Sequence, residues 1–439
     1  MRHALLVVAF LVSGASAAAQ SPPLPETPAG RLLGQWLEVF NSGDRTTIVA
    51  FLDRYNRPEI LDGILSFRSR TGGVDLIKIE RSTPEAIEFV ARERESATRL
   101  LWRVGVSGDP PRAALGPIEE IPPEVTVLNL DIDAASRDAV ISRVIAELAE
   151  NYVFPESAET MADALTRRRG AGEYDGITSG SQFATLLTSH LRDVSHDLHL
   201  GVRFTPWPVP RPTDDPERER EEAEEYRLEM ARVNCEFRKV EILPGNVGYL
   251  KFDGFAHPGV CGPTATAAMN FLQHVDALIV DLRGNGGGNP AMVAYVSSYL
   301  FDEPTHLNDL YNRAANTTHQ WWTLPYVPGG RLGDPPVYVL TSRRTFSAAE
   351  EFSYNLKSLG RATIVGETTG GGAHPTGEVW LTEQFTMRVP FARAVNPITK
   401  TNWEGTGVEP DVSVPAAQAL DRALELIAEG RSKGRPERF

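Results

Sequence analysis

The sequence has few cysteines, few positive charges and no long apolar run in its main part. Its 439 residues include 2 cysteines, and neither has a cluster of histidine and further cysteine residues near it, which argues against a zinc site. Beyond the N-terminal leader, no segment approaches the roughly 18 uninterrupted apolar residues of a membrane-spanning helix, so stable membrane insertion is not expected. Lysine and arginine number 44 against 58 acidic residues, and the net charge of −14 argues against nucleic-acid binding.

Residues 1–19 have the pattern of a signal peptide, with a charged start, the short apolar core ALLVVAFLV and A-x-A cleavage sites. The core is too short to span a bilayer, and no cysteine follows it as in a lipoprotein. We therefore expect a soluble, exported protein, periplasmic or secreted. In such a compartment a disulfide between Cys235 and Cys261 is expected, and closing a loop of about 26 residues would stabilise the fold by roughly 3 kcal/mol.

One segment of the second half has the layout of a nucleophile site. The apolar run VYVL at 337–340 predicts a buried strand, a polar turn follows, and a helix is predicted from about Ser347 to Leu359. Ser347 would lie in the first turn of that helix, where unpaired backbone N–H groups could hold an oxyanion. Serine is also a frequent N-cap, so this segment alone leaves a structural role open.

A glycine run follows a second predicted strand. Residues 277–282, ALIVDL, predict a buried strand, and Gly286, Gly287 and Gly288 after it allow positive φ and close approach to a ligand. Loops at the C-terminal ends of strands commonly supply active-site donors in α/β sheets, and a plain tight turn into a helix at 290–301 is the alternative. No Lys-Ser/Thr pair follows the glycines, so this is not a phosphate-binding P-loop.

An aromatic segment lies between these two strands. Residues 319–328, HQWWTLPYVP, show no clear periodicity, which predicts a loop. Such a loop could line a substrate groove or pack on the core, and the sequence leaves both open.

Four motifs, DLRGNGGG, TFSAAEE, VGETTGGG and NWEGTGVEPD, together resemble peptidase family S41. That family contains the C-terminal processing proteases, the tricorn-type proteases and the interphotoreceptor retinoid-binding proteins. The resemblance covers about residues 136–420. It implies an α/β core of the ClpP/crotonase-like spiral type at 236–425, after a helical subdomain at 136–200. The charged insert between them, at 201–235, is too short for the PDZ domain that many processing proteases carry.

Residues 30–115 predict a separate small α+β domain. RLLGQWLEVFNSGD has helical spacing, while VDLIKIE and LLWRVGV read as strands. This segment resembles the NTF2-like fold, which can hold a ligand pocket or mediate dimerisation. A homo-oligomer formed through this domain is therefore one option.

The base that would activate Ser347 is not a lysine at the place where the processing-protease branch of the family has one. That lysine belongs to a loop of the form GExxxGKG, and the matching position here is Gly372. Lys357 falls within the predicted helix on a face expected to meet solvent, and Lys400 falls in a loop. The resemblance therefore points to the other catalytic arrangement of the family.

The tricorn-like branch combines the serine with an upstream histidine and a downstream glutamate. Glu404 lies 57 residues after Ser347, as that branch implies. Upstream, the segment DVSHDLHL at 193–200 matches the one that supplies the histidine. His199 is the better match in it, and His196 is the rival.

The residue before the histidine departs from the tricorn-like pattern. There a serine links the histidine to the glutamate, whereas this chain has Leu198. Either Glu404 reaches the imidazole directly or through water, or Ser195 or Asp197 orients the ring. These alternatives stay open at the level of the sequence.

The resemblance implies an exported serine peptidase that acts on peptides or proteins through an acyl-enzyme, without a cofactor or metal. An imidazole can take the serine proton at neutral pH, and a carboxylate can stabilise the imidazolium. The backbone N–H groups of Gly287 and Ala348 are the predicted oxyanion hole. The alternative is a catalytically weak or inactive protein that binds hydrophobic ligands or peptides, since retinoid-binding relatives share this core.

Overall fold

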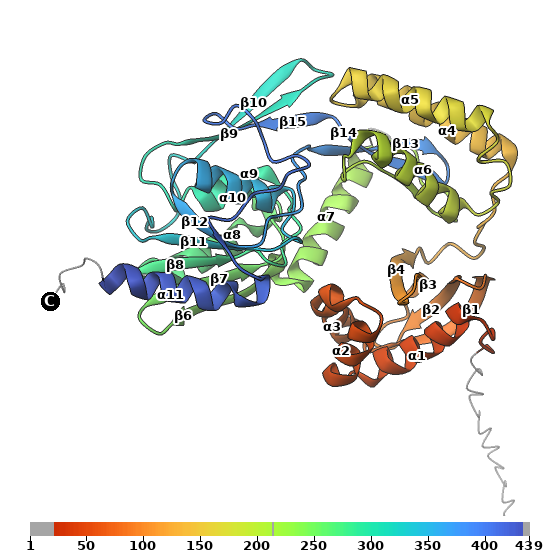
Figure 1. Ribbon diagram of the computed structural model, residues 1–439, viewed down its shortest axis with the longest axis horizontal. Coiled ribbons are helices and arrows are strands. Elements are labelled where there is room, and N and C mark those ends of the chain that lie inside the picture. The colour runs from red at the N-terminus through yellow and green to blue at the C-terminus, as the bar shows by residue number, and fades with distance from the viewer. Residues whose placement is uncertain (1–21, 213–214, 433–439) are drawn as a thin grey trace, which may run out of the picture. The chain divides into compact units, whose positions relative to one another are not determined.

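The computed structural model describes residues 22–212 and 215–432 (Figure 1). The chain divides into two compact units, residues 1–128 and 129–439, and each is described by itself. The predicted leader at 1–19 lies outside the described residues. Within the described ranges, no helix combines the length and the apolar character needed to cross a membrane.

The first unit is an α+β domain with one antiparallel sheet in the order β1-β2-β3-β4. Its elements are α1 (Pro28–Ser42), α2 (Arg45–Arg54), η1 (Pro58–Ile60), α3 (Leu61–Thr71), β1 (Val74–Ser82), β2 (Ala86–Glu93), β3 (Arg99–Ser107) and β4 (Arg112–Ile121). The core is aromatic, because Trp36 and Phe40 of α1 pack around Trp102 of β3 with ring centroids 6.0 and 5.6 Å away. The mixed α+β class predicted for this segment is confirmed, and its likeness to the NTF2-like fold stays a prediction.

The second unit is built on a six-stranded sheet in the order β16-β12-β11-β8-β7-β6. The strands are β6 (Phe237–Leu243), β7 (Val247–Phe252), β8 (Ala277–Asp281), β11 (Val337–Thr341), β12 (Ala362–Gly366) and β16 (Val412–Ser413). Neighbouring strands are parallel except for the antiparallel pair β6 and β7. The two strands predicted from apolar runs, β8 and β11, therefore lie side by side in the middle of the sheet.

Helices cover both faces of this sheet (Figure 1). Alternate strand residues point to opposite faces, so Leu278 and Val339 pack on one side while Ile279 and Leu340 pack on the other. The first side is covered by α8 (Pro258–Phe271), α9 (Pro290–Ser297) and α10 (Ala348–Ser358), and the second by α11 (Ala419–Ser432). The predicted α/β class of the core is confirmed.

A helical layer precedes the core in sequence and packs on a small sheet of its own (Figure 1). The helices are α4 (Ala134–Asn151), α5 (Pro155–Gly170) and α6 (Gly180–Ser195), and the sheet has the order β13-β14-β5. Its strands are β5 (Gly201–Phe204), β13 (Thr376–Thr382) and β14 (Phe385–Pro390). Because β5 pairs with β14, the segment just before β5 is brought to the loop between β12 and β13.

The aromatic segment predicted as a loop is in part a strand, and that prediction was wrong for its first half. A third sheet has the order β10-β9-β15, with β9 (His306–Asn312), β10 (Thr317–Trp322) and β15 (Ala392–Val395). Most residues of β10 are exposed, and the strand lies at the edge of its sheet. An edge strand that buries neither face lacks the apolar alternation by which strands are recognised.

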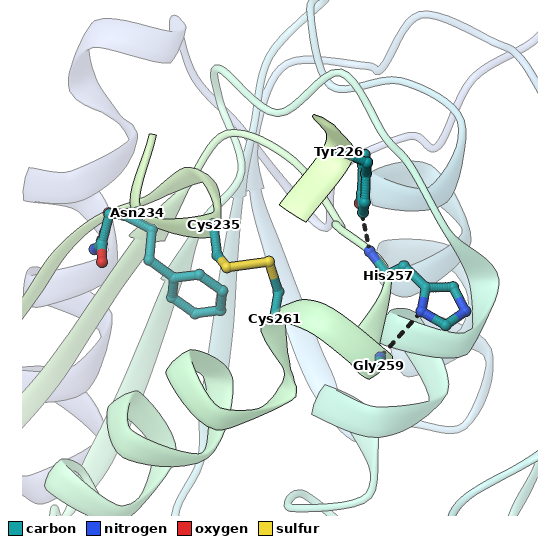
Figure 2. The surroundings of a disulfide bond; sticks show 7 residues. Tyr226, Asn234, Cys235, His257, Gly259 and Cys261 are labelled. Atoms are coloured by element: carbon teal, nitrogen blue, oxygen red, sulfur yellow. Dashed lines mark hydrogen bonds between the residues drawn. A yellow bond between two sulfur atoms is a disulfide. The ribbon is translucent and has the colours of Figure 1, made fainter. Parts of the chain in front are cut away.

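The predicted disulfide is confirmed (Figure 2). Cys235 lies in η2 (Asn234–Glu236), after α7 (Pro216–Arg232) of the charged insert, and Cys261 lies in α8. Their Cα atoms are 5.6 Å apart. A second link lies nearby, because the backbone N–H of His257, the N-cap residue of α8, donates to the hydroxyl of Tyr226 on α7 at 2.9 Å. The acidic helix is thus fastened to the core at two points.

Candidate active site

Ser347 occupies a strained position between β11 and α10. It is the residue immediately before α10, with φ 54° and ψ −120°. Positive φ is unfavourable for a residue with a Cβ, and such positions cost about 1–3 kcal/mol and collect at functional sites. The conformation is held by hydrogen bonds on both sides: the N–H of Phe346 donates to the Asn285 carbonyl at 3.1 Å, and the N–H of Ser347 donates to Glu350 Oε2 at 2.8 Å.

Glu350 ties the serine turn to the glycine loop at 369–372. Besides the Ser347 N–H, its carboxylate accepts hydrogen bonds from Thr369 Oγ1 at 2.5 Å, Gly371 N at 2.6 Å and Gly372 N at 2.8 Å. Burial raises the pKa of Glu350, and the four donors offset part of this rise by favouring the charged form. This role of Glu350 was not predicted, although the S-x-x-E spacing from Ser347 is that of a capping box.

His199 is buried in the same cleft that Ser347 lines. Its ring packs on the ring of Phe346 with centroids 4.7 Å apart, and burial lowers its pKa to about 4. Neither ring nitrogen has a hydrogen-bond partner among the described residues, so no hydrogen bond joins His199 to Ser347 in this structure. The ring is therefore neutral near pH 7 and is free to accept a proton.

The rivals of His199 lie elsewhere. His196 is exposed at the C-cap of α6, with φ 56°. Lys357 is on α10, but its Nζ donates to the Glu409 carbonyl at 2.6 Å and lies 3.1 Å from a carboxylate oxygen of Asp411. Lys400 is exposed in the loop after β15. The structure therefore brings His199, and none of these three residues, into the cleft beside Ser347.

Gly372, at the family's lysine position, lies against the imidazole. A methyl group on its Cα would be 2.5 Å from Cε1 of His199 and 2.3 Å from the ring of Phe346. No side chain fits there while His199 keeps its place. A glycine at position 372, in place of a lysine, thus leaves the space that the His199 ring occupies.

Asp197 is the acidic residue nearest to the His199 ring. Its carboxylate accepts the His199 backbone N–H at 2.9 Å, and Oδ1 lies 3.8 Å from Nδ1 of the same residue. Oδ2 lies 2.9 Å from Nδ1 of His374 and accepts the Tyr152 hydroxyl at 3.2 Å. Burial alone would raise the pKa of Asp197, but its bond to His374 and the nearby histidine charges outweigh burial and keep it below the ordinary value.

Glu404 belongs to the same cluster but contacts His374 rather than His199. Its Oε2 accepts the Ala373 N–H at 2.5 Å and lies 3.4 Å from Nδ1 of His374, while Oε1 has no partner among the described residues. Burial raises the pKa of Glu404 to about 7. His374 thus lies between Glu404 and Asp197. His374 was not predicted as a site residue, and the only local signal for it was its place directly after the glycine loop.

The two predicted oxyanion donors lie together beside Ser347. A methyl group on Gly287, which has φ 106°, would be 2.7 Å from Ser347 Cβ and 3.0 Å from the Ala348 nitrogen, so only glycine fits. The N–H of Gly287, however, donates to Asn285 Oδ1 at 2.9 Å. The next residue, Gly288, lines the cleft together with Ala348. The glycine run therefore reaches the serine as predicted, but in this structure the Gly287 N–H is already engaged.

The cleft itself has a volume of about 390 Å³. Besides Ser347 and His199, apolar side chains line it. They include Leu310 of β9, Phe391 between β14 and β15, and Trp403 in the loop after β15. A smaller pocket of about 230 Å³ is also lined by His199.

One combination of side chains in this cluster could face a metal ion. Donor atoms of Asp197, His199 and Glu404 lie within 4.8 Å of one another. Bonds of about 2.0–2.2 Å to a single zinc ion would require these atoms to be closer, and Asp197 is already bonded by His374 and Tyr152. We assign no metal to this cluster.

Comparison with known proteins gives two matches to family models in adjoining segments. Residues 246–414 match peptidase family S41, and residues 131–244 match the N-terminal domain of peptidase S41 in eukaryotic IRBP. Together they span more than half of the chain and contain all the site residues described above.

Solved structures that resemble the chain at low sequence identity include several peptidases. A putative peptidase from Parabacteroides merdae is 18% identical, with 68% of this chain and 99% of that chain covered and a TM-score of 0.49. The photosystem II D1 C-terminal processing protease is 15% identical, with 66% and 97% covered and a TM-score of 0.41. The tricorn protease is 12% identical, with 81% and 46% covered and a TM-score of 0.46.

Proposed function

Because the chain belongs to peptidase family S41, we propose that it is a serine peptidase that cleaves peptide bonds through an acyl-enzyme on Ser347. One observation carries this proposal: a strained serine at a helix start and a buried histidine without a partner line the same cleft. Strain at the nucleophile and an unsatisfied buried base both cost stability, and both are expected where catalysis requires them.

His199 is the general base. The Ser347 hydroxyl loses its proton to the imidazole as Oγ bonds to the substrate carbonyl carbon, and the proton then passes to the leaving amine as the C–N bond breaks. A water molecule then attacks the acyl carbon and gives a proton to His199. The imidazole returns the proton to Ser347 Oγ as the ester bond breaks and the acid leaves. Catalytic hydrogen bonds are often long in free enzymes, so the bond from Ser347 to His199 forms when substrate is bound.

In this proposal Asp197 orients and supports the imidazole of His199. This is one of the alternatives that the sequence left open. Asp197 holds the His199 backbone, lies closest to Nδ1, and keeps its charge mainly through its bond to His374. Glu404 acts one step further away, through His374. Glu404 therefore supports the site without touching the base.

The oxyanion forms against the N–H groups at the start of α10 and the glycine run. Ala348 supplies one donor, and the helix N-terminus adds a favourable field. The second donor comes from the run 286–288: Gly287 as predicted if its N–H leaves Asn285, or Gly288, which already lines the cleft. Each such donor contributes roughly 3–4 kcal/mol to the transition state.

We also propose that the protein is exported. The leader-like residues 1–19 direct the chain to an oxidising compartment, where the bond between Cys235 and Cys261 persists. The substrates are peptides or proteins that meet the enzyme there.

The test is covalent labelling with a fluorophosphonate probe, followed by mass spectrometry of the labelled peptide. Wild-type protein should be labelled on Ser347, and Ser347→Ala should not be labelled at all. Ser358→Ala, at the other end of α10, is the matched control and should be labelled normally. A folded wild-type protein that resists labelling would instead support the binding-protein alternative.

A further inference from the structure

A buried carboxyl that takes no part in the mechanism above lines the cleft. Glu351 lines the cleft one helical turn beyond the serine, and its N–H donates to the Ser347 carbonyl at 2.9 Å. The residue is 4% exposed, and its Oε1 makes no hydrogen bond within the described parts of the chain. A buried carboxylate oxygen without a hydrogen bond costs stability, so its position calls for an explanation.

The residues around Glu351 do not explain why one of its carboxylate oxygens is buried without a hydrogen bond. Asn308 of β9 and Asn355 of α10 are fully buried beside it and offset part of the effect of burial, which raises the pKa of Glu351 to about 7. Yet the Nδ2 atoms of both amides lack a hydrogen bond of normal geometry. The surroundings of the Glu351 carboxyl are thus polar and incompletely hydrogen-bonded.

The charges and walls of the cleft indicate which kind of ligand group could pair with Glu351. Among the described residues that line it, none is lysine or arginine, so the protein itself offers Glu351 no cation. The walls are apolar, with Leu310, Phe391, Ala394 and Trp403. Four residues along a helix advance about 6 Å, which is comparable with an extended lysine side chain reaching from the attacked carbonyl at Ser347.

We propose that Glu351 is the specificity-determining residue of a pocket for a lysine or arginine side chain, on the residue whose carbonyl Ser347 attacks. The apolar walls pack on the methylene stem, and the ammonium or guanidinium group donates to the free carboxylate oxygen. Asn308 and Asn355 then complete the hydrogen bonding around the ion pair. This inference rests on the proposed peptidase function and names its substrate class.

The first test measures binding, which requires no turnover. Ser347→Ala protein is titrated calorimetrically with acetylated tripeptide amides that end in lysine, norleucine or acetyl-lysine. Norleucine keeps the stem of lysine without its ammonium group, so the lysine peptide should bind about tenfold or more tightly than the other two. In Ser347→Ala/Glu351→Gln protein the preference should vanish, while the norleucine peptide binds as before.

The second test measures cleavage of a randomised decapeptide mixture, with the cut sites read by mass spectrometry. Lysine and arginine should be enriched on the acyl side for wild-type protein, and Glu351→Gln should remove that enrichment. Glu378→Gln, a carboxyl-to-amide change at the smaller neighbouring pocket, is the matched control and should leave it intact. Thermal unfolding should show that each variant is folded.

The outcomes separate this inference from the peptidase proposal. Equal binding of lysine and norleucine peptides, a preference that survives Glu351→Gln, or no saturable binding of either peptide overturns the cation pocket. If lysine is preferred in binding but no fluorophosphonate labels Ser347, the pocket stands and the peptidase proposal fails. If labelling succeeds and cleavage shows no basic preference, the peptidase proposal stands and the pocket fails.

Discussion

Replacing Asp197 by asparagine should slow acylation of Ser347 much more than the same change at Glu404. Asp197 Oδ1 lies 3.8 Å from Nδ1 of His199. With an effective dielectric constant near 20, a carboxylate at that distance stabilises the imidazolium by roughly 4 kcal/mol. Such a loss corresponds to about a thousandfold in rate. Glu404 has a pKa of about 7, so at pH 6 it is mostly protonated and Glu404→Gln should cost about tenfold or less.

The assay is the second-order rate of fluorophosphonate labelling at pH 6, measured on proteins whose thermal unfolding shows them to be folded. Tyr152→Phe is the control, because it removes one hydrogen bond to Asp197 without removing the charge. Its labelling rate should stay close to that of the wild type. The reasoning is refuted if Asp197→Asn labels within about tenfold of wild type, or if Glu404→Gln falls as far as Asp197→Asn at this pH.

Three further predictions concern packing, pH and the disulfide. Gly372→Ala should lower the labelling rate at least about tenfold, because the new methyl group would displace His199, whereas Gly176→Ala, where the added methyl meets nothing within 4 Å, should have no effect. The acid limb of the pH–rate profile should lie near pH 4 rather than 6.5, since burial favours neutral His199; a limb near 6.5 would show that the ring is solvated in the working enzyme. Joint replacement of Cys235 and Cys261 by serine should lower the free energy of unfolding in urea by roughly 3 kcal/mol, and an unchanged value would mean that the bond does not constrain the unfolded chain.

Local elements were predicted best where burial imposes a recognisable pattern of apolar residues on the sequence. The strands β8 and β11 and the helix α10 were identified from apolar runs and helical spacing, because each is buried in the core. The edge strand β10 was not, since most of its side chains are exposed. The disulfide was predictable because a chain that is expected to be exported and has two cysteines allows one pairing.

The arrangement around the base could not be predicted in the same way. Ser347, His199 and the glycine run were found because family motifs carry them. The link from Asp197 through His374 to Glu404 joins three distant segments, and no local pattern reports a contact of that kind. The engagement of Gly287 by Asn285 depends on the direction of a single N–H, which composition and spacing do not fix.

The pairing of β5 with β14 has a consequence for the time at which activity can arise. His199 stands just before β5, and β5 gains its sheet partner only when residues 385–390 are available. A chain emerging from a ribosome or a translocation channel therefore cannot position its base until nearly all of it has emerged. Such long-range pairing is also among the later events of folding, since the loop it closes is long. The proposed peptidase activity would therefore be absent until the C-terminal part of the chain has been made and has paired with β5.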